Sequence, residues 1–307
     1  MHTIFRYITS RTRILFLFAA MLSVLAVVCP RSTPACEVVV VNNTDLKPYQ
    51  DALRGFRDAS TCNVRELKLQ GGEDDEDVLL HSQDAIVAVG TAAFKKIRTI
   101  TSLPVVYVMV MPSETAPSSL GPNISGVSMD PSPGSSLAAM REVFPWAKKI
   151  GLLYDPKRTG AFVDEAVTAA RAAGLELIAK QAHNPRDIPR LLEELRSAID
   201  LFWMLPDPTV VTAETTDYLL RFSFQSNVPL FSFSSKYVEL GAIAALDTDP
   251  YDMGAQAGDI VNRLSLGHKG AIREYARALR LSINEKVAAK MGLTIRSAVI
   301  KKAKNGE

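Results

Sequence analysis

The stretch Asp84-Ala85-Ile86-Val87-Ala88-Val89-Gly90-Thr91-Ala92 contains the unit from which this chain is built. Its short apolar run, rich in β-branched residues, is typical of a buried β-strand. The glycine that follows lets another backbone or a ligand approach closely. Residues 92–100 then show helical spacing. The stretch therefore predicts a strand that leads through a glycine turn into a helix.

The same alternation of apolar strand and helix recurs on both sides of this stretch. Before it, the valine-rich run 37–41 and the alternating run 64–69 predict strands, with a helix at 48–59 between them. After it, further strands and helices follow as far as residue 291. Strands separated by helices of about 12 residues indicate βαβ units and parallel sheets, so we expect an α/β fold.

A proline-rich break divides the alternation into two runs. Pro131 and Pro133 interrupt the pattern, and it restarts at Gly134. Two such runs predict two doubly wound lobes, which is also the domain number that the length favours at about 150 residues a domain. We expect a first lobe at residues 36–129 and a second at 130–249. Residues 250–307 are expected to form a return segment, with helices that cross back to the first lobe and a tail.

The first 35 residues have the pattern of a secretory signal. Three arginines precede the apolar run 14–28, and small residues follow it. The run is shorter than the roughly 20 residues of a comfortable membrane span, although an uncleaved anchor is the alternative. We therefore expect the protein in the periplasm or on the outer face of the cytoplasmic membrane, attached to the membrane only through a lipid or an N-terminal anchor.

Cys36 and Cys62 precede the first and second predicted strands. If those strands are parallel neighbours, both sulfurs lie at one sheet edge, where a disulfide is geometrically possible and permitted outside the cytoplasm. Cleavage after Ala35 would instead leave Cys36 at the N-terminus, where it could carry a lipid. The two fates compete for one sulfur. Disulfide, lipid anchor and free thiol stay open at this point.

Composition and motifs argue against several classes of function. The formal net charge is +2, and no basic stripe with interleaved aromatic residues occurs, which argues against nucleic acid as a partner. The chain has no HExxH, CxxC, G-x-S-x-G, G-x-G-x-x-G or Walker A pattern. We therefore expect no metal, no cofactor and no enzymatic activity.

Candidate ligand-binding residues follow the predicted strands, because ligands of open α/β sheets bind at the carboxyl ends of the strands. In the first lobe these are Asn42, Asn43, Thr44, Gly90, Thr91 and Ala92, with Tyr49 in the helix that follows the first strand. In the second lobe they are Asp155, Asp207, Ser234 and Asp249. The same residue types also cap helices and form turns, so the prediction depends on all of them facing one cleft between the lobes.

Several stretches resemble a known family. They include Leu103-Pro104-Val105-Val106, Asn123-Ile124-Ser125-Gly126-Val127-Ser128, Phe144-Pro145-Trp146-Ala147-Lys148-Lys149-Ile150-Gly151 and Leu205-Pro206-Asp207-Pro208-Thr209. In their order and spacing they are similar to the ABC-transporter substrate-binding proteins related to the bacterial tryptophan- and aromatic-amino-acid-binding lipoproteins. The resemblance implies two Rossmann-like lobes joined by a hinge, as in type I periplasmic binding proteins. The chain departs from the family pattern at Met109-Val110-Met111-Pro112, where relatives often have Asp-Pro.

The resemblance also implies a function. The lobes would close on a small ligand, such as an amino acid, and deliver it to an ABC permease and its ATPase. Charge complementarity suggests a zwitterion, with its carboxylate at the Gly90 and Thr91 amides and its ammonium near Asp207 or Asp249. The alternative is a sensor subunit whose lobes bind a ligand and signal to a membrane partner. A secreted enzyme is a third hypothesis, for which the sequence offers no catalytic constellation.

Overall fold

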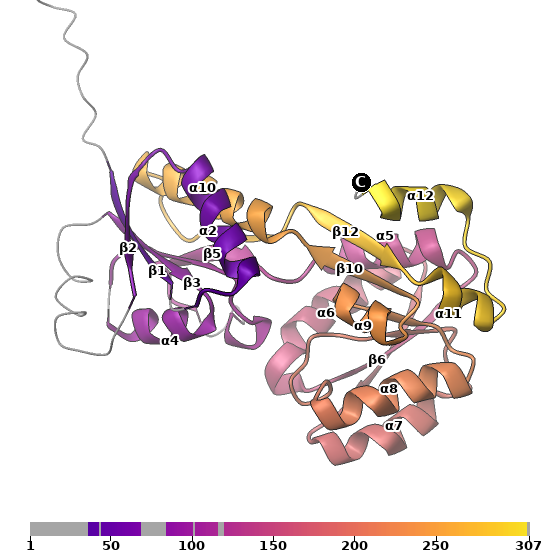
Figure 1. The fold of residues 1–307 in the computed structure, drawn as a ribbon. Coiled ribbons are helices and arrows are strands. Elements are labelled where there is room, and N and C mark those ends of the chain that lie inside the picture. Colours follow the sequence, from indigo (N-terminus) through magenta and orange to yellow (C-terminus); the bar gives the residue numbers. More distant parts are fainter. Residues whose placement is uncertain (1–35, 43, 69–83, 101, 116–119, 306–307) are drawn as a thin grey trace, which may run out of the picture. The chain divides into compact units, whose positions relative to one another are not determined.

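Two six-stranded sheets, each with helices on both faces, form the framework of the computed structural model (Figure 1). The structure describes residues 36–42, 44–68, 84–100, 102–115 and 120–305. The expected signal segment and the candidate residue Asn43 lie outside these residues. Within them, no helix has both the length and the apolar character needed to cross a bilayer.

The first sheet has the strand order β11-β5-β4-β3-β1-β2, and all its pairings are parallel. Its strands are β1 (Glu37–Asn42), β2 (Asn63–Leu67), β3 (Ala85–Val89), β4 (Val105–Val108), β5 (Ile124–Ser128) and β11 (Arg273–Tyr275). Alternate side chains point to opposite faces. Val38 and Val40 contact the cluster of α2 (Lys47–Ala59) and α10 (Pro250–Ser265), and Val39 and Val41 that of α4 (Thr91–Ile100).

Helices α2 and α10 lie side by side on one face of this sheet (Figure 1). A Cβ atom at Gly55 would lie 1.9 Å from the carbonyl oxygen of Tyr251, and one at Gly254 would lie 1.8 Å from that of Ala52. No side chain fits at such distances. The two helices therefore touch backbone to backbone, and this contact attaches residues 250–265 to the first sheet.

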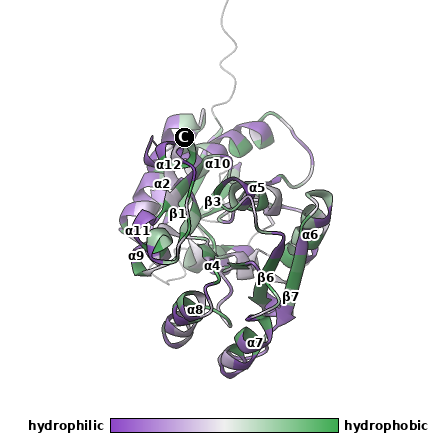
Figure 2. Ribbon diagram, turned by 90° about the vertical axis from the view of Figure 1, so that its right-hand side faces the viewer, coloured by the Kyte–Doolittle hydropathy of each residue, from purple (hydrophilic) through white to green (hydrophobic). Residues whose placement is uncertain are grey.

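The second sheet has the order β12-β10-β9-β8-β6-β7, in which β12 alone runs antiparallel to its neighbour. Its strands are β6 (Lys149–Tyr154), β7 (Glu176–Gln181), β8 (Leu201–Trp203), β9 (Leu230–Ser232), β10 (Ala244–Thr248) and β12 (Leu279–Ile283). Its helices are α5 (Pro133–Val143), α6 (Pro156–Ala172), α7 (Ile188–Leu195), α8 (Ala213–Gln225), α9 (Ser235–Leu240), α11 (Glu285–Lys290) and α12 (Ser297–Asn305). In Figure 2, strand β6 is largely green, whereas helix α2 of the first lobe is largely purple, as expected for a buried strand and a surface helix.

The described chain passes between the two sheets near residues 129–132, at residue 249 and at 276–278. Strand β11 therefore belongs to the first sheet, while β12 and the helices after it belong to the second. Residues 297–305, in the expected tail, form the helix α12. Val299 of this helix is buried in the core of the second lobe, and Ile300 and Ala303 pack against that core.

Cys36 and Cys62 form a disulfide, with their Cα atoms 4.8 Å apart. Strands β1 and β2 are parallel neighbours, and Glu37 lies opposite Asn63 in their register. Both cysteines therefore stand at the amino-terminal end of adjacent strands. In this structure the sulfur of Cys36 is engaged in the bridge.

Candidate ligand-binding site

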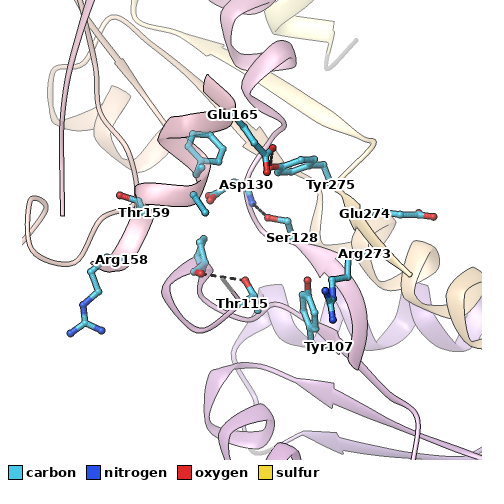
Figure 3. A pocket seen from close by; sticks show the side chains of 13 residues that line it. Tyr107, Thr115, Ser128, Asp130, Arg158, Thr159, Glu165, Arg273, Glu274 and Tyr275 are labelled. Atoms are coloured by element: carbon cyan, nitrogen blue, oxygen red, sulfur yellow. Dashed lines mark hydrogen bonds between the residues drawn. The ribbon is translucent and has the colours of Figure 1, made fainter. Parts of the chain in front are cut away.

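A cavity of about 180 Å³ is lined by residues of both lobes (Figure 3). Strands β4, β5 and β11 of the first sheet and the short 3-10 helix η1 (Pro112–Glu114) form one wall, and the first turns of α6 form the other. The lining residues are Tyr107, Pro112, Thr115, Ser128, Asp130, Arg158, Thr159, Ala161, Phe162, Glu165, Arg273, Glu274 and Tyr275. The cavity thus combines aromatic rings with charged groups of both signs.

Asp130 is the central acidic group of this cavity. It lies in the first connection between the sheets, two residues after β5, and it is 7% exposed. Its own N–H donates to the hydroxyl of Ser128 at 3.2 Å. Among the described residues, none donates a hydrogen bond to its carboxylate. Burial therefore raises the pKa of Asp130 to about 7, since nothing nearby compensates the loss of water.

A cation and a tyrosine form the first-lobe wall. Arg273 is fixed by carbonyl groups: its Nε donates to Ile124 at 3.1 Å and its Nη2 to Gly121 at 2.8 Å. Its side chain lies beside the ring of Tyr107 (Figure 3). Burial raises the pKa of Tyr107 to about 12, and the nearby Arg273 acts in the opposite direction. The hydroxyl of Tyr107 therefore stays protonated at neutral pH.

One hydrogen bond crosses the cavity between the lobes. The hydroxyl of Tyr275, on β11, donates to the carboxylate of Glu165, on α6, at 2.6 Å. Burial raises the pKa of Tyr275, and the Glu165 carboxylate raises it further. Figure 3 shows this pair on the same side of the cavity as Asp130, whereas Arg158 points away from the other labelled side chains.

A second, much smaller cavity lies behind Asp130. It is lined by Asp130, Pro131, Ser136, Phe162, Trp203, Leu205, Pro206, Phe231, Ser232, Phe233 and Leu246, at the carboxyl ends of β8, β9 and β10. Phe162 lines both cavities and packs edge-on against Trp203, with ring centroids 5.7 Å apart. An apolar, aromatic-lined recess therefore adjoins the buried carboxylate.

The structure brings most of the predicted first-lobe residues together, but in a different cavity. Thr44, Tyr49, Gly90, Thr91 and Ala92 line a hollow of about 180 Å³ at the ends of β1 and β3. The Gly90 N–H already donates to the carbonyl of Val108 at 2.9 Å, and the Thr91 hydroxyl accepts from the N–H of Met111 at 3.0 Å. Asn42 is buried and its side chain accepts from the N–H of Thr44 at 3.1 Å.

Asp155 and Asp207 also lie together, in a network of hydrogen bonds within the second lobe. Asp207 is fully buried; its Oδ2 accepts from the N–H of Asp155 at 2.8 Å and from the hydroxyl of Thr159 at 2.6 Å. Its Oδ1 accepts from the N–H groups of Thr209 and Val210. Four donors of the chain thus occupy this carboxylate, and its place is structural.

Asp155, Ser234 and Asp249 cap helices. Asp155 accepts from the N–H of Lys157 and from the Thr209 hydroxyl. Burial raises the pKa of Asp155, but these hydrogen bonds outweigh that effect, and its pKa is lowered. Ser234 caps α9. Asp249 caps α10 and its other oxygen is hydrogen-bonded to Arg280. None of these three lines the cavity between the lobes.

The sequence reasoning missed the residues that do line this cavity. The predicted site residues follow the expected strands. Asp130 instead lies in the connection between the sheets, and Arg273 lies on an edge strand that was not predicted. The sequence gives little signal for Asp130, because an aspartate in a connection rich in Ser, Pro and Gly is also typical of a turn. In the described part of the chain, no group of three or more His, Cys, Asp and Glu side chains could hold a metal.

Comparison with known proteins identifies the family. The family model described as "ABC transporter substrate binding protein" matches residues 76–306. The chain belongs to this family. The resemblance seen in the sequence is therefore confirmed at the level of the family, which comprises ligand-binding proteins.

Individual relatives are distant. The "Tyrosine-binding protein" of Clostridioides difficile (strain R20291) is 23% identical over 142 residues, which cover 46% of this chain and only 41% of that protein. A Streptococcus pneumonia ABC domain solved in complex with L-Trp is 20% identical and covers 88% of this chain and 98% of its own, with a TM-score of 0.58. A ligand-free, open substrate-binding protein with adhesive properties from Clostridium difficile is 17% identical, covering 86% and 97%, with a TM-score of 0.63. These structures confirm the predicted α/β fold with two mostly parallel sheets, of the type I periplasmic-binding-protein kind.

Proposed function

We propose that this substrate-binding protein captures a free amino acid in the cavity lined by both lobes. The observation that carries the proposal is the Asp130 carboxylate, which is buried, lines the cavity and receives no hydrogen bond from the described residues. A buried carboxylate of this kind is costly unless it is neutralised or paired. An ammonium group of a ligand would satisfy it and would favour its ionised form.

The rest of the cavity suits the other parts of an amino acid. The guanidinium of Arg273 offers a positive charge to a carboxylate, and this side chain is already held in place by carbonyl groups. The rings of Tyr107, Tyr275 and Phe162 offer apolar surface for a side chain. Two related proteins, the tyrosine-binding protein and the ABC domain solved in complex with L-Trp, support an aromatic amino acid.

The proposed setting is that of a transport protein outside the cytoplasmic membrane. Ligand contacts divided between two lobes stabilise the arrangement in which both touch the ligand, so binding closes the lobes. The closed protein would deliver the amino acid to an ABC permease and its ATPase. Uptake of that amino acid by cells should fall when the gene is deleted and return when it is restored.

A thermal-shift screen of residues 36–307 tests the ligand class. The screen compares L-amino acids, small peptides, nucleosides and sugars. A ligand at 100 times its Kd adds about 2.7 kcal/mol to the free energy of unfolding, which is a clear shift. We expect amino acids alone to stabilise the protein.

Two matched variants make the screen specific. Asp130→Asn removes the charge that faces the cavity and should abolish the shift. Asp217→Asn removes a carboxylate that is 64% exposed and paired only with Arg221, and it should leave the shift unchanged. A shift produced only by sugars or nucleosides, or one that Asp130→Asn leaves intact, would overturn the proposal.

A further inference from the structure

The C-terminal end of the chain is strongly basic. Between Glu285 and Asn305 the sequence has six lysine and arginine residues and one acidic residue, although the whole chain carries a formal net charge of only +2. The six cations are Lys286, Lys290, Arg296, Lys301, Lys302 and Lys304, and all six residues are exposed.

Side-chain contacts fix three of these cations against neighbouring elements of the second lobe. Helix α12 is attached to the second core through Val299, so its lysines point away from that core. Arg296 donates to the carbonyl of Glu142 at 3.0 Å, and Lys302 pairs with the carboxylate of the same residue at 3.0 Å. Lys304 pairs with Glu285, at the start of α11, at 2.8 Å. Three of the six cations, Arg296, Lys302 and Lys304, thus lie against Glu142 at the end of α5 or Glu285 at the start of α11.

An exposed tryptophan lies close in the sequence to Glu142, the residue that Arg296 and Lys302 contact. Trp146 follows Glu142 by four residues, is 48% exposed and packs edge-on against Phe144. Lys148 and Lys149, both exposed, follow it after the buried Ala147. Tryptophan beside lysine is the combination found where proteins meet the headgroup layer of a membrane, since the indole is apolar at one end and polar at the other. We call the six cations together with Trp146 the C-terminal basic face.

We propose that the C-terminal basic face binds the anionic phospholipid headgroups of a membrane surface. Long, exposed lysine side chains match a dense layer of negative charge better than the shaped surface of a protein, whose interface would need a central apolar cluster. A basic patch is also the second signal that makes a single membrane anchor stable. The biological setting rests on the proposed extracytoplasmic location, whereas the binding itself can be measured without it.

Vesicle binding tests the proposal. Residues 36–307 are mixed with vesicles of phosphatidylcholine alone or of phosphatidylcholine with phosphatidylglycerol. We expect co-sedimentation only with the anionic vesicles, and its loss at about 0.5 M salt, where charges are screened within a few ångström. The emission of Trp146 should shift to shorter wavelength on binding. Trp146→Phe should abolish that shift, because the other tryptophan, Trp203, is buried at 3% exposure.

Charge-reversal variants locate the contact. Lys290→Glu with Lys301→Glu should weaken binding to anionic vesicles by roughly tenfold or more. The matched control, Lys236→Glu with Lys269→Glu, makes the same change of net charge at exposed lysines elsewhere and should weaken it less than twofold. Equal weakening by both pairs, or equal binding to both kinds of vesicle, would overturn the proposal.

The remaining outcomes separate this proposal from ligand capture. If anionic vesicles fail to bind but reversal of Lys290 and Lys301 lowers amino-acid uptake by cells, the face contacts a protein and the lipid proposal is wrong. Both charge-reversal pairs should keep the ligand-induced thermal shift, because neither touches the cavity. If the unmutated protein does not bind anionic vesicles, only the membrane proposal fails. If amino acids produce no thermal shift in the unmutated protein, only the proposal of amino-acid capture fails.

Discussion

The hydroxyl of Thr159 donates to the carboxylate of Asp207 at 2.6 Å. Asp207 is fully buried, whereas Thr159 lines the cavity between the lobes, so this bond joins the buried acid to the cavity wall. The same carboxylate accepts from the N–H of Asp155, the residue that caps α6. Asp207 therefore fixes the start of α6, the helix that carries Phe162 and Glu165 into the cavity. The oxygens of Asp207 themselves are occupied by four donors of the chain.

Asp207→Asn should destabilise the fold strongly. The amide nitrogen would face N–H and hydroxyl donors in a buried place, so we expect the free energy of unfolding to fall by about 2–4 kcal/mol. Urea unfolding measures it. Asp217→Asn, at an exposed ion pair, should cost less than about 1 kcal/mol. Equal losses in the two variants would contradict a structural place for Asp207.

Asp130 should make stability fall as pH rises. Burial raises its pKa from 3.8 to about 7. The unfolded chain ionises at the ordinary pKa, so from about pH 4 to about pH 7 the folded state holds a proton that the unfolded state has released. The loss of stability across this window is at most about 4 kcal/mol, at 1.36 kcal/mol per pKa unit.

Asp130→Asn isolates this contribution from that of other groups. Between pH 5 and pH 8, the unfolding free energy of the unmutated protein should fall relative to that of the Asp130→Asn variant. Asp217→Asn provides the control. A difference that is independent of pH would mean that Asp130 ionises normally in the folded state.

The framework of the fold follows from local patterns. The valine-rich run at 37–41 and the helical pattern at 48–59 predicted β1 and α2 almost to the residue, because such patterns report which side chains are buried. Strand β11 was missed because Arg273, Glu274 and Tyr275 show no apolar pattern. Its place depends on pairing with β5, which is a tertiary contact.

The candidate site was harder to predict for the same reason. Gly90, Thr91 and Asp207 have residue types that serve caps and turns as well as ligands, and the structure shows Gly90 and Asp207 already hydrogen-bonded to the chain. Arg273 comes within reach of Tyr107 only after some 165 residues of chain have folded between them. No local pattern records that proximity.

Gly254→Ala should disrupt the contact between α2 and α10. Its Cβ would lie 1.8 Å from the carbonyl oxygen of Ala52, so the helices must move apart. We expect a loss of about 1–3 kcal/mol in urea unfolding. Gly160→Ala, also in a helix, has its nearest neighbour at 3.9 Å and should be neutral or slightly stabilising. Equal effects of the two changes would contradict the close helix packing.

The disulfide between Cys36 and Cys62 should stabilise the first lobe. It joins residues 26 positions apart, and closing such a loop contributes roughly 3–4 kcal/mol in the chain-entropy model. The paired variant Cys36→Ser with Cys62→Ser should lower the unfolding free energy by about this amount. Mass spectrometry of the exported protein checks the premise, because a lipid on Cys36 would exclude the bridge.

The most direct test of ligand capture is titration calorimetry with a matched pair of ligands. The pair consists of the amino acid that raises the unfolding temperature most and its N-acetyl derivative, which lacks the ammonium. We expect the free amino acid to bind the unmutated protein about 100-fold more tightly than the derivative, and Asp130→Asn to remove this preference. Equal binding of the two ligands, or a preference that survives Asp130→Asn, would contradict this expectation.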